Sequence, residues 1–159
     1  MSNFRIVPLS KDAALRIQQA RQDSYGNAVL EQTATGYGPC RLTLTAFKPG
    51  VDQRLLFAYS PFNAEGLYAE KGPVFISATK TEPYADVHRF PPQIKADPVN
   101  FPLSLLGYSA DNQMVFTKLV GVDDIDDLLS ETLDNHPEIV YLHVRNSEAC
   151  CYICAVERA

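Results

Sequence analysis

The sequence predicts an α+β fold of about eight mostly antiparallel strands, with two helices packed on the sheet. Three observations lead to this prediction. Short stretches in which apolar and polar residues alternate recur between turn residues, which is typical of hairpin-linked strands. Only two stretches place apolar residues at helical spacing. With 159 residues, of which 46% are hydrophobic, the chain suits one domain, and we expect that domain to span residues 1–159.

The first half of the chain supplies one helix and four strands. Ser10 is a suitable N-cap for a helix over 11–23, whose apolar residues share one face. Residues 26–39 are rich in turn formers and predict a loop. Strands are expected over 4–7, 41–47, 53–60 and 74–78.

The second half begins with a segment, 83–102, that contains five prolines. Because proline fixes φ and donates no ladder hydrogen bond, we expect no regular element there. The segment either wraps the body of the domain or forms a functional lid. A second helix is expected over 123–135, and strands over 103–108, 113–120, 139–145 and 150–157.

The last two predicted strands form a hairpin with two unlike faces. We expect Arg145 to lie opposite Cys150, so that His143 lies opposite Tyr152. One face is then apolar and packs in the core, whereas the other is polar and aromatic: Tyr141, His143, Arg145, Cys150, Tyr152 and Cys154. The second face is either covered by a helix or loop, or is the floor of a ligand site.

The chain has four cysteines, at positions 40, 150, 151 and 154. The N-terminus shows no export signal, so we expect a cytoplasmic protein with reduced thiols. In a strand, Cys151 and Cys154 point to opposite faces, which favours neither a metal nor a disulfide, and we expect no metal and no cofactor. Cys40 precedes Arg41 and is either a small buried residue or a nucleophile activated by the cation.

The charge distribution restricts the partners. A net charge of −5 argues against nucleic acid, and no apolar run is long enough to cross a membrane, so neither is an expected partner. Carboxylates concentrate in the second predicted helix, beginning at Asp123 and Asp124. They either complement the helix dipole or form an acidic face that docks a protein.

A series of short motifs runs through most of the chain: Asp23-Ser-Tyr-Gly26, Gly38-Pro-Cys-Arg-Leu-Thr-Leu44, Gly72-Pro-Val-Phe-Ile76, Leu142-His-Val-Arg-Asn146 and Cys151-Tyr152 with Val156-Glu-Arg158. Together they resemble the bacterial family known as domain of unknown function 1203. The resemblance implies a single bacterial domain with this order of elements, and it implies no activity or cofactor. The family's motif residues that fall on Cys40, Arg41, His143, Arg145 and Asn146 fit either a shared site or shared packing.

The function that these patterns favour is binding of a small anionic ligand or a peptide. Arginine offers a planar fork for carboxylate or phosphate, and histidine and tyrosine add hydrogen-bonding groups. The expected ligand-binding residues are Cys40, Arg41, His143, Arg145, Asn146 and Tyr152. One alternative is an enzyme that uses Cys40 or His143. A second alternative is a protein-interaction module that uses the acidic helix 123–135.

Overall fold

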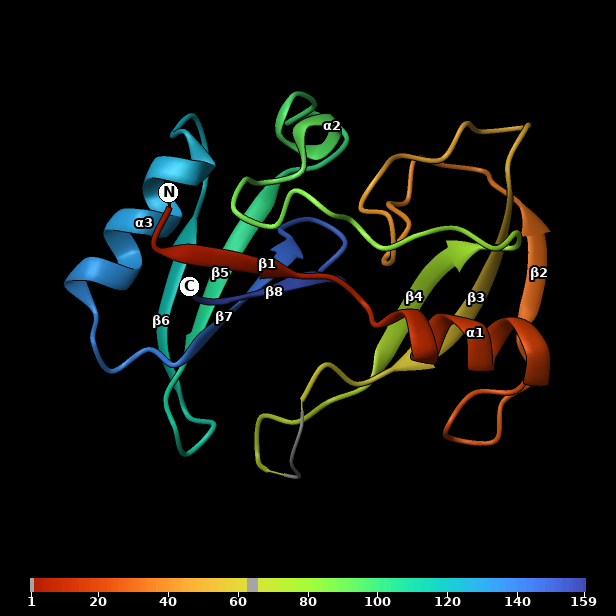
Figure 1. Ribbon diagram of the computed structural model, residues 1–159, viewed down its shortest axis with the longest axis horizontal. Coiled ribbons are helices and arrows are strands. Elements are labelled where there is room, and N and C mark those ends of the chain that lie inside the picture. The colour runs from red at the N-terminus through yellow and green to blue at the C-terminus, as the bar shows by residue number, and fades with distance from the viewer. Residues whose placement is uncertain (1, 63–65) are drawn as a thin grey trace.

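A computed structural model describes residues 2–62 and 66–159, and these residues form two antiparallel sheets that lie side by side (Figure 1). The large sheet has the strand order β1-β8-β7-β5-β6, and the small sheet has the order β2-β3-β4. The strands are β1 (Phe4–Val7), β2 (Leu30–Thr33), β3 (Gln53–Tyr59), β4 (Gly72–Ser77), β5 (Leu103–Tyr108), β6 (Met114–Leu119), β7 (Tyr141–Asn146) and β8 (Tyr152–Arg158). With helices α1 (Lys11–Ala20), α2 (Pro92–Lys95) and α3 (Ile125–Asn135), the α+β prediction is confirmed.

Each sheet has its own hydrophobic core. Helix α3 buries Leu128, Leu129 and Leu133 in the core of the large sheet, because these residues recur at helical spacing. Helix α1 places Ala14 and Ile17 in the core of the small sheet. Its N-cap is Ser10, whose side chain accepts a hydrogen bond from the backbone of Ala13, as the sequence predicts. The helix ends at Ala20 and not at residue 23, since Arg21 adopts a left-handed conformation.

The predicted strand over 41–47 is wrong, and it marks the boundary between the two cores. Residues 40–45 instead form a tight turn, in which Leu44 donates a backbone hydrogen bond to Cys40. Leu42 packs in the core of the small sheet, and Leu44 packs in the core of the large sheet. The apolar residues therefore alternate because this segment contributes side chains to two cores. The third strand of the small sheet is β2, which lies within the predicted loop 26–39 and is mostly exposed.

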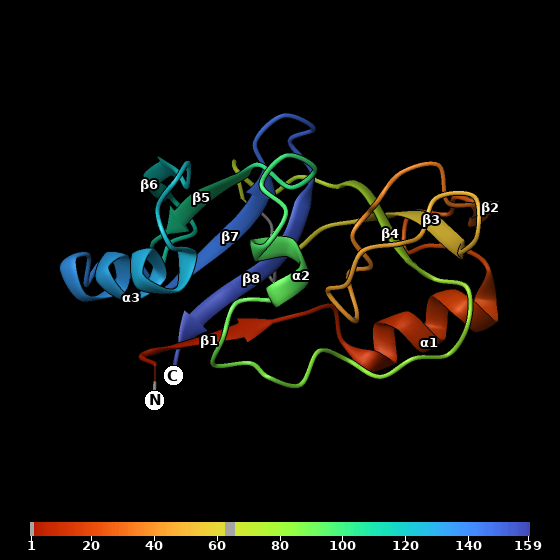
Figure 2. The ribbon, with the colours of Figure 1, turned by 90° about the horizontal axis from the view of Figure 1, so that it is seen from above.

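The proline-rich segment 83–102 wraps the body of the domain. Figure 2 shows the chain between β4 and α2 passing along α1 and β1. The backbone of Ile6 donates to Val87, and the backbone of Tyr84 donates to Leu42. The expectation of no regular element is wrong in one respect: Pro92–Lys95 form one helical turn, which proline tolerates at its start because no partner is needed there.

The hairpin of β7 and β8 differs from the predicted register. Arg145 lies opposite Tyr152, and a bulge follows, so that Val144 lies opposite Cys154 and His143 opposite Ala155. The bulge adds one residue to β8. Beyond the bulge, the side chains of β8 that the predicted register turns away from the core therefore face it. Cys154 therefore belongs to the core of the large sheet and not to the polar face. Tyr141, His143, Arg145 and Tyr152 remain together on the other face.

Candidate functional site

His143 lies at the centre of an aromatic cluster on the polar face of β7. Its ring lies 4.8 Å from Phe62, 4.9 Å from Tyr108, 5.1 Å from Tyr152 and 5.2 Å from Tyr141. Only 1% of His143 is exposed. Burial, aided by the charge of Arg145, lowers the pKa of His143 from 6.5 to about 3. The imidazole is therefore neutral near pH 7, and its Nδ1 has no hydrogen-bond partner among the described residues.

Arg41 is a buried cation between the two sheets. Its Nε donates to the carbonyl of Tyr152 across 2.7 Å, and its Nη1 donates to the carbonyl of Pro39. Burial lowers the pKa of Arg41, and its interaction with the nearby Cys151 side chain opposes this shift. No carboxylate pairs with Arg41 among residues 2–62 and 66–159, so its positive charge lacks an anionic counterpart there.

The turn before Arg41 depends on a glycine. Gly38 has a φ of 91°, which favours glycine, and a Cβ at this position would lie 2.5 Å from Cδ2 of Phe47. This close approach directs the following residues across the end of the small sheet, where Cys40 pairs with Phe75 of β4. The turn thus places the guanidinium of Arg41 beneath the start of β8.

Arg145 belongs to β7, and its guanidinium is only partly engaged. Its Nη1 donates to the carbonyl of Cys150 at 3.1 Å, and its Nη2 lies 3.0 Å from a carboxylate oxygen of Glu70. The side chain of Arg145 is 13% exposed, whereas that of Glu70 is 65% exposed. The Nε of Arg145 is buried and has no partner in the described part of the chain. On the edge of the guanidinium formed by Nε and Nη2, only Nη2 thus has a partner among the described residues.

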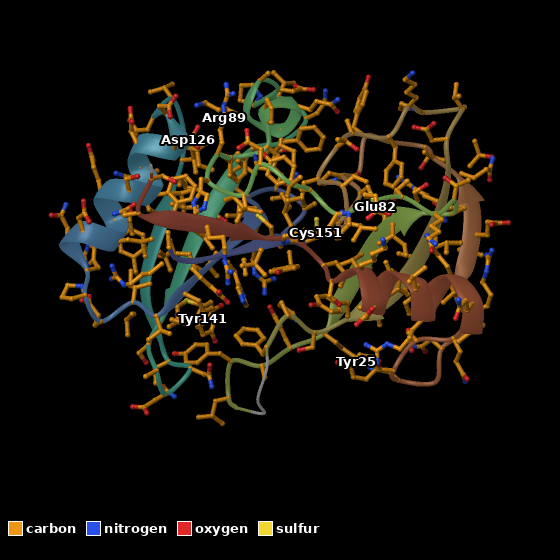
Figure 3. All side chains as sticks on the ribbon, viewed as in Figure 1. Tyr25, Glu82, Arg89, Asp126, Tyr141 and Cys151 are labelled. Carbon is orange, nitrogen blue, oxygen red and sulfur yellow. The ribbon has the colours of Figure 1, made fainter. Side chains whose placement is uncertain are left out.

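Arg145 borders a groove of about 210 Å³ between the two sheets, here called the junction groove. Figure 3 shows Cys151 in this region, between the large and the small sheet. The groove is lined by Tyr59, Pro61, Glu70–Val74, Arg145 and Ala149–Tyr152. Tyr152 contacts Tyr59 with ring centroids 6.0 Å apart, and burial raises the pKa of Tyr152 well above its ordinary value. The tyrosine hydroxyl therefore stays protonated at neutral pH.

The structure brings together four of the six residues expected to bind the ligand: Arg41, His143, Arg145 and Tyr152. Cys40 lies apart, because it packs in the core of the small sheet and borders a separate pocket of about 300 Å³. Asn146 organises the β7–β8 turn: its Oδ1 accepts from the backbone of Glu148 and of Ala149.

Sequence reasoning missed two residues of the groove, Glu70 and Tyr59. Both lie in or next to the loop that follows β3, and their sequence neighbours give no sign that they approach the C-terminal hairpin. Cys151 was weighed only for metal and disulfide chemistry. The feature that makes it notable is its proximity to Arg41, which is 110 positions away in the sequence.

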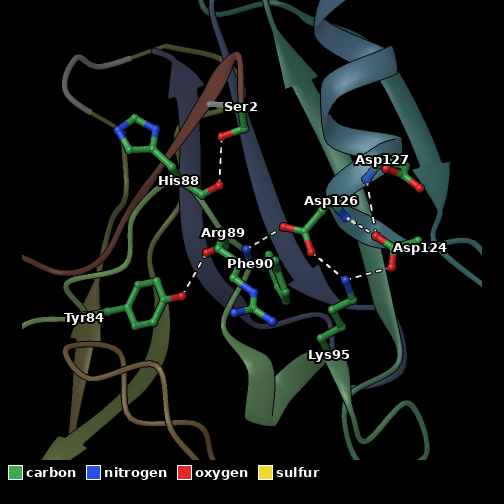
Figure 4. Close-up of polar contacts among 9 residues, drawn as sticks. All are labelled: Ser2, Tyr84, His88, Arg89, Phe90, Lys95, Asp124, Asp126 and Asp127. Carbon is green, nitrogen blue, oxygen red and sulfur yellow. Dashed lines mark hydrogen bonds and ion pairs between the residues drawn. The ribbon is translucent and has the colours of Figure 1, made fainter.

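The acidic start of α3 is engaged within the fold (Figure 4). The carboxylate of Asp124 caps the helix by accepting from the backbone of Asp126 and Asp127. Asp126 accepts from the backbone of Phe90 at 2.7 Å and lies 2.6 Å from the ammonium of Lys95, so it fastens the proline-rich segment. Exposed carboxylates, including Asp123 and Asp127, flank this contact.

Within the described ranges, no three His, Cys, Asp or Glu side chains are grouped so that they could hold a metal ion. None of the helices in the described ranges has the length and apolar character needed to cross a membrane.

Comparison with known proteins places the chain by family. Neither the curated proteins nor the solved structures contain a match. A family model does match, and it covers residues 37–158, which include β3 to β8, Arg41 and the whole junction groove. The chain therefore belongs to the family described as "Protein of unknown function (DUF1203)".

Proposed function

We propose that the junction groove binds a small anion that carries a carboxylate or a phosphate. The observation that carries this proposal is the half-used guanidinium of Arg145. Nε and Nη2 lie on one edge of a guanidinium and together fit the two oxygens of an oxyanion. In Arg145, Nη2 pairs with the exposed carboxylate of Glu70, while Nε has no partner among the described residues.

The charge balance around the groove supports an anionic ligand. Arg41 and Arg145 both contact the segment Cys150–Tyr152, and the carboxylate of Glu70 pairs with Arg145 alone. A buried cation without a counter-charge costs free energy, because the protein interior solvates it less well than water. An anion in the groove would occupy the fork of Arg145 and would bring a negative charge to the hairpin segment that Arg41 contacts.

Glu70 then acts as an internal competitor for the same fork. Its side chain is mostly exposed, so water can solvate the carboxylate once it leaves Arg145. A ligand with two oxygens on one centre would replace a single contact by two. The rings of Tyr59 and Tyr152 would enclose the remainder of a small ligand.

We also place this activity in the cytoplasm. The four cysteines are free thiols, and two of them, Cys150 and Cys151, are accessible at the groove. A reducing compartment preserves thiols in that setting.

The proposal is tested by binding of inorganic phosphate and of succinate, measured by thermal shift and calorimetry. A ligand at 100 times its Kd should stabilise the fold by about 2.7 kcal/mol. Arg145→Gln should abolish this gain, and Glu70→Gln should strengthen binding several-fold because the competitor is removed. Arg5→Gln and Glu157→Gln are matched controls, since this exposed pair lies on β1 and β8 away from the groove. Unchanged binding by Arg145→Gln would refute the proposal.

A second candidate function is nucleophilic chemistry in the same groove. The enzymatic alternative drawn from the sequence relied on Cys40 or His143, but Cys40 lies in a core and His143 is enclosed by aromatic rings. The thiol in the groove that lies near Arg41 is that of Cys151. A thiol beside a cation is a common setting for a nucleophilic cysteine.

Alkylation kinetics separate this candidate from simple binding. At a cationic site, iodoacetate should modify Cys151 faster than the neutral reagent iodoacetamide does. The thiolate of Cys151 would attack the methylene carbon of either reagent, form a C–S bond and release iodide. The measurement uses Cys150→Ser, so that the neighbouring thiol does not contribute. A preference for iodoacetamide would rule the candidate out.

A further inference from the structure

We infer that a second groove, between α2 and the start of α3, binds a short segment of a partner protein in which an apolar side chain stands next to Lys or Arg. This α2–α3 groove has a volume of about 640 Å³. Its lining comes from Ile94–Lys95, Pro98, Phe101–Leu103, Leu119–Ile125 and Ser147. None of these residues lines the junction groove, so the inference is independent of the proposed function.

The interior of the α2–α3 groove is apolar. Its floor is made of Ile94, Phe101, Leu103, Val120 and Ile125, all of which are buried in the core of the large sheet. A volume of several hundred Å³ is typical of pockets that hold a ligand or the anchoring side chains of a peptide. Apolar anchors in such pockets supply most of the binding free energy in protein complexes.

The rim of the groove carries apolar side chains that the fold does not cover. Val122 is fully exposed, and Leu119, at the end of edge strand β6, is 68% exposed. The turn that contains Val122 needs no apolar residue at this position, since the buried residues beside it are Val120 and Ile125. Apolar side chains that surround an apolar pocket are characteristic of a surface that binds another protein.

Charge decides between the occupants of this surface. Asp123 and Asp124 line one end of the groove, and Asp126 and Asp127 follow them in the first turn of α3. Two cations oppose them: Lys95 is shared between Asp124 and Asp126, and Lys118 lies 3.8 Å from Asp123. The excess of negative charge favours a basic residue beside the apolar anchor.

The same charge disfavours two other occupants. A second copy of the chain would bring its own acidic groove, and each copy has a net charge of −5. An anionic lipid surface would likewise be repelled. A basic, apolar segment of a different protein is therefore the occupant that satisfies both the lining and the charge of the groove.

The experiment is a selection of random heptapeptides displayed on phage, followed by calorimetry with the enriched peptides as synthetic probes. We expect the enriched sequences to pair Leu, Ile, Met or Phe with a neighbouring Lys or Arg. Binding should weaken at least about tenfold in the double variant Leu119→Ser, Val122→Ser, as expected when an anchoring contact is lost. Asp123→Asn should weaken binding less and should reduce its salt dependence.

Matched controls come from exposed residues elsewhere. Val51→Ser removes a valine that is 68% exposed in a turn of the small sheet, and Asp111→Asn removes a carboxylate of the β5–β6 turn. Neither should change peptide affinity, and neither should Arg145→Gln. All of the substituted groove residues are exposed, so urea unfolding should show folded variants. Enrichment of acidic peptides, equal losses in the controls, or a concentration-dependent dimer abolished by Val122→Ser would each overturn the inference.

Discussion

The Nε of Arg41 donates to the backbone carbonyl of Tyr152 across 2.7 Å and thereby joins two segments that are 111 residues apart in the sequence. One segment belongs to the boundary between the two cores, and the other begins the last strand of the large sheet. This contact joins the turn at the core boundary to Tyr152, a residue that lines the junction groove.

Arg41→Lys should destabilise the protein strongly. Lysine lacks the planar fork that reaches the carbonyls of both Tyr152 and Pro39, so at least one buried acceptor loses its donor. A lost donor at a buried site costs about 1–3 kcal/mol of unfolding free energy. Arg5→Lys, at an exposed ion pair, should cost less than about 1 kcal/mol. Urea titration measures both, and equal losses would contradict this account of Arg41.

His143 should make stability depend on pH. Its pKa is about 3 in the folded protein, against an ordinary value of 6.5, so between these values the unfolded chain binds more protons than the folded one. The contribution of His143 to the free energy of unfolding should therefore be complete above pH 6.5, and it should be lost as the pH falls from 6.5 towards 3. The total effect is on the order of a few kcal/mol.

The variant His143→Phe tests the origin of this dependence. Phenylalanine suits the aromatic surroundings and does not titrate, so the slope between pH 6.5 and 4 should become smaller. Tyr141→Phe changes the same cluster but keeps the imidazole, and it should retain the slope. Urea titrations at pH 7, 5.5 and 4 give the comparison. A slope that persists unchanged in His143→Phe would assign it to other groups.

The four thiols should react in two classes. Cys150 is exposed and Cys151 partly so, whereas Cys40 and Cys154 are buried. Burial raises the pKa of Cys154 to about 12, so its thiolate is scarce at pH 8. A chromogenic disulfide reagent should titrate two thiols rapidly in the folded protein and all four in urea. Cys150→Ser should remove one fast thiol, and four equal rates would contradict the buried positions.

Asp126 should hold the proline-rich segment against the large sheet. Its carboxylate accepts the backbone N–H of Phe90 and pairs with Lys95, so Asp126→Ala should free that amide. We expect hydrogen exchange at Phe90 to accelerate at least about tenfold, as in a locally opened segment. Asp127→Ala, one residue along the same helix, is the control and should leave the amide protected. Equal exchange in both variants would show that other contacts hold the segment.

The sequence predicted the elements that bury their own side chains through local periodicity. Helix α3 and the hairpins of the large sheet follow from apolar residues at regular spacing, and Ser10 and Asp124 show that helix starts are also locally encoded. The pattern failed at Leu42 and Leu44, because alternation is the same whether two side chains face one sheet or enter two cores. Strand β2 was missed since its residues are mostly exposed.

The candidate site was predictable only in part, for a related reason. The polar face of β7 follows from a period of two, and it holds His143 and Arg145 whatever the register of its partner. The bulge after Tyr152 has no local signature, so Cys154 was assigned to the wrong face. Glu70 reaches Arg145 from a distant loop, and no spacing in the sequence encodes that contact.

The pairing of β1 with β8 has a consequence for how the chain acquires its structure. Phe4 lies opposite Arg158, so β1 gains its partner only after the residues up to β8 have been made. During synthesis, β1 stays unpaired until β8 has been made. The small sheet can form earlier, because its strands pair in sequence order. Contacts of such long sequence separation are slow to form. The β1 strand is thus exposed to chaperones and to other unfolded chains for longer than the strands of the small sheet are.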